Sequence, residues 1–117
     1  MSDKTTRVTM LYSSTTHGTL ETMWKPAADV YRTSSGWLLK FELAGVALDD
    51  VTVTARGSAI TVSGVRRDHV SEGNCCLYSM EIMYSQFERT VHLPCEIESA
   101  QLDIQIRNGI LLVRATL

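Results

Sequence analysis

Cysteine and histidine are the residue types in this chain most able to bind a metal or act as nucleophiles. Cys75 and Cys76 are adjacent and Cys95 stands alone, so the C-x-x-C spacing of zinc sites does not occur. The histidines are scattered through the chain: His17, His69 and His92. Adjacent cysteines close a disulfide only with strain. We therefore interpret the cysteines as reduced thiols and predict no metal site. A redox or intermolecular role for the Cys75–Cys76 pair is the alternative.

Two acidic pairs and one basic cluster are the other candidates for chemistry. Asp49-Asp50 is interpreted as a solvated turn leading into a strand, because neighbouring side chains there point apart. Glu96 and Glu98 receive the same interpretation, and Arg66-Arg67-Asp68 is interpreted as the start of a polar loop. No Gly-rich phosphate loop, G-x-S-x-G turn or recognisable nucleophile–base spacing occurs. The sequence therefore predicts neither an enzyme nor a cofactor.

Length and charge restrict the class of partner. A chain of 117 residues is long enough for one domain with its own core. Its 11 basic and 13 acidic residues give a formal charge of −2, which predicts no nucleic-acid partner. The apolar runs are too short to span a bilayer, so no membrane association is expected. The first residues, MSDKTTRVTMLYSSTTHG, lack the apolar core of a secretory signal, which predicts a cytoplasmic location.

Alternation of apolar and polar residues predicts a series of short strands. Leu39, Phe41 and Leu43 are expected on one strand face, with Lys40 and Glu42 on the other. Similar patterns place strands at residues 28–31, 37–43, 51–55, 59–63, 77–84 and 87–93, with a polar loop over 65–76. No segment has a clean helical period. The chain is therefore predicted to be an all-β antiparallel sandwich.

The last part of the chain reads as a β-hairpin. Leu102, Ile104 and Ile106 alternate with polar residues, and Asn108-Gly109 tolerates the positive φ of a tight turn. A second apolar strand follows the turn. At the other end, residues 1–23 are rich in Ser and Thr and are predicted to form a short flexible N-terminal segment. The folded domain is expected over residues 24–117.

Four sequence pieces then point to a known family. They are D-V-Y at 29–31, E-L-A-G-V at 42–46, F-E-R at 87–89 with L-P at 93–94, and N-G-I-L at 108–111. Together they resemble, over residues 24–117, the α-crystallin domain of the small heat-shock proteins. Ala44 departs from the pattern, because the family has proline there. The resemblance implies an immunoglobulin-like sandwich and an ATP-independent chaperone (a holdase) that binds unfolding proteins.

The resemblance also implies a homodimer. The long spacing from Gly64 to Phe87 is similar to that of members that exchange a strand between subunits. The residues expected at the dimer interface are Leu77, Tyr78, Met80, Glu81, Ile82 and Arg89. Ile82 stands where many exchanging members have arginine.

A groove for clients or for a family tail is implied as well. Its expected residues are Val51, Val53, Ala55, Leu102, Ile104 and Ile106, and plain core packing is the alternative for each. Residues 10–12 of the N-terminal segment are expected to extend this client surface. Ile104 stands where the family signature has alanine, so it is expected to narrow the groove.

The family usually carries an I-x-I or I-x-V tail after the last hairpin, and this sequence ends at Leu117 without one. Dimers or small assemblies are therefore expected, with non-native proteins as partners. The alternative function is a non-chaperone interaction or adaptor module, similar to the CS-domain co-chaperones. The fold alone does not decide between the two.

Overall fold

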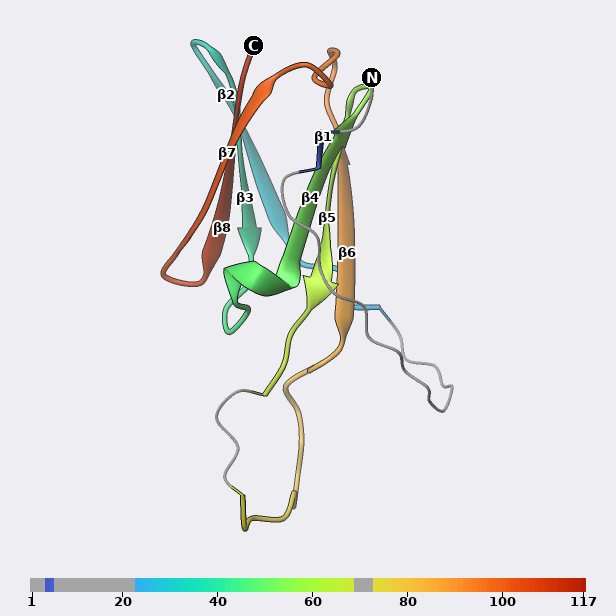
Figure 1. Ribbon diagram of the computed structural model, residues 1–117, viewed down its shortest axis with the longest axis vertical. Coiled ribbons are helices and arrows are strands. Elements are labelled where there is room, and N and C mark those ends of the chain that lie inside the picture. The colour runs from blue at the N-terminus through green and yellow to red at the C-terminus, as the bar shows by residue number, and fades with distance from the viewer. Residues whose placement is uncertain (1–3, 6–22, 69–72) are drawn as a thin grey trace.

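Two antiparallel sheets face each other in the computed structural model, which describes residues 4–5, 23–68 and 73–117 (Figure 1). One sheet has the strand order β1-β4-β5-β6, and the other has the order β2-β3-β8-β7. The strands are β1 (Lys4–Thr5), β2 (Ala28–Thr33), β3 (Gly36–Glu42), β4 (Val51–Arg56), β5 (Ala59–Val65), β6 (Gln86–His92), β7 (Gln101–Arg107) and β8 (Ile110–Thr116). This confirms the predicted all-β sandwich.

Helical structure in the described residues is limited to a single 3-10 turn, η1 (Leu48–Asp50), which leads into β4. It contains the Asp49-Asp50 pair that the sequence placed in a turn before a strand. Within the described ranges, no helix is long and apolar enough to cross a membrane.

The core lies between the sheets and is built from the inward positions of each strand. Leu39 and Phe41 of β3 are fully buried, and they lie opposite Val113 and Leu111 of β8 in the strand register. Phe87 of β6, also fully buried, comes from the other sheet. Since side chains alternate between the two faces of a strand, period-2 burial follows from the sequence pattern. The outward positions of β3 are correspondingly more exposed.

The β7–β8 hairpin has the predicted turn. Asn108 and Gly109 adopt φ values of 53° and 80°, both in the left-handed region. The Gly109 carbonyl accepts a hydrogen bond from the Leu43 backbone N–H at 2.8 Å, so the turn is joined to the end of β3. A Cβ atom at Gly109 would lie 3.1 Å from the Cα atom of Ala44. Glycine is therefore favoured there by conformation and by space.

The prediction of a strand at residues 77–84 is wrong for the single chain. These residues carry no ladder, and the next strand, β6, begins only at Gln86. A strand is stable only when a neighbouring strand shares its backbone hydrogen bonds, and none of the strands in the described residues pairs with this segment. Most of the predicted flexible segment, residues 1–23, lies outside the described residues, including residues 10–12. Lys4–Thr5 is described, and it pairs with β4 at Ala55 and Thr54.

We expect Gly109→Ala to lower the free energy of unfolding by about 1–2 kcal/mol, because an alanine pays a steric penalty at positive φ and crowds Ala44. Urea denaturation followed by fluorescence measures this change. Asn108→Gly is the matched control. It also alters the turn, but glycine accepts the left-handed conformation, so its stability should stay within about 0.5 kcal/mol of wild type. Equal losses in both variants would contradict the explanation.

Candidate functional site

The outer edge of β2 is the first candidate surface. Among the described strands, β2 is the terminal strand of its sheet, and it pairs with β3 along all six of its residues. Val30 and Tyr31 on this strand are 42% and 45% exposed. They are consecutive residues, so their side chains point to opposite faces and apolar surface is available on both faces of the edge. An edge of this kind can accept a further strand from another chain.

The loop between β5 and β6, residues 66–85, is the second candidate surface and is called the protruding loop below. Its described part extends beyond the end of both sheets, as the yellow trace in Figure 1 shows. Its apolar side chains are exposed: Leu77 71%, Tyr78 99%, Met80 54%, Ile82 55% and Met83 43%. Glu81 is also exposed. Such a run of exposed apolar residues indicates a binding surface.

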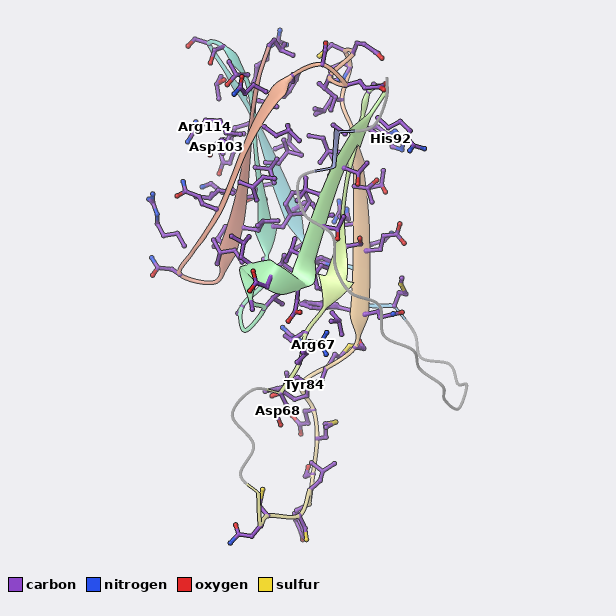
Figure 2. The ribbon with its side chains drawn as sticks, viewed as in Figure 1. Arg67, Asp68, Tyr84, His92, Asp103 and Arg114 are labelled. Carbon is purple, nitrogen blue, oxygen red and sulfur yellow. The ribbon has the colours of Figure 1, made fainter. Side chains whose placement is uncertain are left out.

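The root of the protruding loop is held by contacts that sequence reasoning missed. The guanidinium of Arg66 lies 3.9 Å from the centre of the Trp24 ring. It also donates hydrogen bonds to the Met83 and Ala44 carbonyls. Figure 2 labels the neighbouring Arg67, Asp68 and Tyr84, which lie where the loop leaves the sandwich. The sequence marked residues 66–68 only as a polar loop start, because no local pattern reveals a contact with Trp24.

Arg89 lies apart from the exposed loop residues. It occupies an inward position of β6 between Phe87 and Val91 and is half-buried. Its Nη1 atom donates a hydrogen bond of 2.9 Å to the Pro26 carbonyl. Pro26 is fully buried and comes just before β2. The structure therefore places Arg89 near the start of the open β2 edge and not beside residues 77–82.

The six residues expected to form the client groove fall into two groups. Val51, Val53 and Ala55 of β4 are core residues with at most 1% exposure. Leu102, Ile104 and Ile106 of β7 are half-buried and pack against the core from the outer strand of the second sheet. β1 pairs with the outer edge of β4. In this chain only the β7 group is accessible to a ligand without a displacement of other residues.

The reactive residue types are dispersed. Cys75 and Cys76 are exposed thiols in the protruding loop, and Cys95 is a half-buried thiol. In the part of the chain that the structure describes, no three His, Cys, Asp or Glu residues are grouped closely enough to hold a metal ion. His92 is exposed on β6, while His17 and His69 lie outside the described residues.

An open hollow of about 640 Å³ lies on the outer face of the β2-β3-β8-β7 sheet. Its wall is mixed, with apolar Leu38, Ile110 and Leu112 beside charges of both signs such as Lys40 and Glu42. No nucleophile with an adjacent base lines it. The described surfaces are therefore suited to binding apolar or extended chains.

Comparison with known proteins agrees with this geometry. The model of the Hsp20/alpha crystallin family matches residues 29–117, which is most of the chain. The chain belongs to this family. The resemblance seen in the four sequence pieces is confirmed, and so is the α-crystallin sandwich.

Relatives of this Hsp20 family chain include small heat shock protein C2 of Rickettsia felis, 30% identical over 103 residues, covering 88% of this chain and 64% of the relative. Spore protein SP21 of Stigmatella aurantiaca is 30% identical over 86 residues, covering 74% of this chain and 51% of SP21. The chain thus spans less than two thirds of these relatives' length.

Solved structures show the same fold. HSP18.5 from E. histolytica superposes with a TM-score of 0.64 at 28% identity, covering 80% of this chain and 88% of that one. Heat shock protein 16.0 from Schizosaccharomyces pombe gives a TM-score of 0.70 at 24% identity, over 80% of this chain and 86% of that one.

Proposed function

We propose that this chain is an ATP-independent holdase that works as a strand-exchanged homodimer in the cytoplasm. Membership of the Hsp20/alpha crystallin family supports a chaperone role. The observation that carries the dimer is the coexistence of an open β2 edge and an exposed apolar loop in one chain. In the proposed dimer, residues 77–82 of each chain pair with β2 of the other.

The chemistry of the two surfaces suits this exchange. In an extended conformation Tyr78, Met80 and Ile82 lie on one face, since side chains alternate along a strand. That face can cover Val30, while the loop backbone hydrogen-bonds to the outer edge of β2. Full burial of a side chain of this size contributes ~1.5–3 kcal/mol. Several such side chains offset part of the entropy that is lost when residues 77–82 become ordered, and the backbone hydrogen bonds to β2 contribute further.

Clients are proposed to bind through the accessible apolar residues of β7, namely Leu102, Ile104 and Ile106. These side chains are half-buried, so they offer apolar surface at the rim of the sandwich without exposing a large patch. The proposed partners are a second copy of the chain and non-native proteins. Nucleic acid is not among them, because the formal charge of −2 provides no basic excess.

An adaptor module without general chaperone action is the second candidate. It is favoured by the deep burial of Val51, Val53 and Ala55, which leaves only half of the expected groove accessible. An adaptor would bind one specific partner and would not protect an arbitrary unfolding protein. A client-aggregation assay therefore distinguishes the two functions.

The dimer and the holdase activity are tested together with the wild-type chain and Met80→Asp. We expect wild type to elute as a dimer of two 13.0 kDa chains in light scattering coupled to size exclusion. It should also keep a heat-unfolding enzyme soluble. Met80→Asp should raise the dimer dissociation constant about 100-fold or more, because an unpaired carboxylate is costly to bury.

Asn74→Asp is the matched control, since it adds the same charge to the exposed protruding loop outside residues 77–82. It should leave the dimer intact. A monomeric wild type, or a Met80→Asp protein that remains a dimer, would refute the exchange. A dimer that leaves the model client to aggregate would favour the adaptor.

Ile104→Glu tests the client surface on β7. We expect it to reduce the apparent affinity for the heat-unfolded client about tenfold, because it places a charge where apolar client side chains would pack. Gln105→Glu introduces the same residue at the next, exposed position and should have little effect. Fluorescence anisotropy with a labelled client measures both. Equal affinities in the two variants, with equal urea midpoints, would count against binding at β7.

The thiols of the protruding loop give a separate test of the dimer. Adjacent Cα atoms are 3.8 Å apart, shorter than the separation that a relaxed disulfide spans, so Cys75 and Cys76 are expected to crosslink between chains. After mild oxidation with diamide, which accepts the two electrons and two protons released by two thiols, a non-reducing gel should show a band of two chains. Cys75→Ser/Cys76→Ser should abolish this band and Cys95→Ser should retain it. No band in wild type would contradict the expectation.

A further inference from the structure

Arg66, the first residue of the protruding loop, joins three segments through one side chain. Its Nε atom donates to the Met83 carbonyl at 2.9 Å, on the limb of the loop that returns to the sandwich. Its Nη1 atom donates to the Ala44 carbonyl at 3.1 Å, in the turn after β3. The Cζ atom lies 3.9 Å from the centre of the Trp24 ring. No other residue type offers a planar cation with several donors in this arrangement.

Trp24 is a fixed platform for this cation. Its backbone N–H donates to the Gln86 carbonyl at 2.9 Å, and its carbonyl accepts from the Glu88 N–H at 3.1 Å. Its ring meets Phe87 edge-on, with the ring centres 5.4 Å apart. Phe87 is fully buried. The indole is therefore tied to β6 by backbone bonds and to the core by its ring, so a group stacked on it has a defined position.

Both limbs of the protruding loop are thereby held at its root. The Arg66 backbone N–H donates to the Ser85 carbonyl at 3.1 Å, and the side chain holds Met83 two residues earlier. Met83 directly follows residues 77–82, the segment proposed to pair with a second copy. The Arg66 side chain therefore contacts the chain at the point where residues 77–82 return to the sandwich, and Figure 1 shows this loop extending away from both sheets.

We infer that Arg66 is a positioning residue for dimerisation: stacked on Trp24 and bonded to Met83, it orients residues 77–82 toward β2 of a second copy. This inference rests on the proposed strand exchange. Arg66 should therefore change the dissociation constant of the dimer of folded chains, separately from any change in the free energy of unfolding. The planar guanidinium is essential, because its separate N–H groups reach the Met83 and Ala44 carbonyls at the same time. Lysine could place a cation over Trp24, but its single ammonium group could not hold both carbonyls in this fixed geometry.

The test measures the dimer dissociation constant of Arg66→Gln and Arg66→Lys by sedimentation velocity, at a temperature well below unfolding. We expect Arg66→Gln to raise the constant at least tenfold and Arg66→Lys to raise it by a smaller factor. Arg67→Gln is the matched control. Arg67 is the next residue, and its Nε atom pairs at 3.2 Å with Asp50 of η1. Its dissociation constant should stay within twofold of wild type.

Urea denaturation of the same variants separates positioning from plain stabilisation. A merely structural role would shift the urea midpoint of Arg66→Gln and leave the dissociation constant of the folded chains unchanged, which would overturn the inference. Should Arg66→Gln fold poorly, a wild-type dissociation constant in Arg66→Lys would overturn it equally. Failure of the strand exchange itself is recognised separately, because wild type would then be monomeric or Met80→Asp would remain dimeric.

Discussion

Backbone hydrogen bonding at the outer edge of β2 (Ala28–Thr33) is the constraint on which the proposed assembly depends. One side of this strand is bonded to β3 along its whole length. The N–H and C=O groups on the other side have no strand beside them in the described chain, so water must satisfy them. The protruding loop has the matching need: residues 77–82 are mostly apolar and exposed, and their backbone pairs with no described strand. One interaction between two chains would satisfy both.

Much of the sandwich could be predicted because burial on one face of a strand imposes a two-residue period. Leu39, Phe41 and Leu43 alternate with polar residues, and all three are fully buried. The final turn was equally predictable, since Asn108 and Gly109 are the residue types that accept positive φ at low cost. These local preferences agree with the final fold, so short-range patterns are sufficient to identify the strands they belong to.

The candidate site was less predictable because it depends on contacts between distant residues. The apolar pattern of residues 77–84 is typical of a strand, but a pattern does not specify which chain supplies the neighbouring strand. The alternation of apolar and polar residues predicted an inward-facing position for both Val51 and Ile104. Their burial nevertheless differs: Val51 belongs to the buried core, whereas Ile104, on the last strand of its sheet, is half-buried and packs against the core from its rim. The stacking of Arg66 on Trp24 has no sequence pattern at all.

The two open edges of the β2-β3-β8-β7 sheet differ in a way that favours exchange at β2. On β7 the outward positions are polar and exposed. One of them, Asp103, lies opposite Arg114 of β8 (Figure 2). A strand paired with β7 would lie beside these polar and charged side chains, and charged side chains at a sheet edge discourage strand pairing. On β2, Val30 and Tyr31 point to opposite faces and both are exposed, so an added apolar strand gains burial on each side. Charged residues occur on β2 as well, at Asp29 and Arg32, so the deciding difference is the exposed apolar surface: β2 offers it on both faces, whereas the apolar residues of β7 all lie on its inward face.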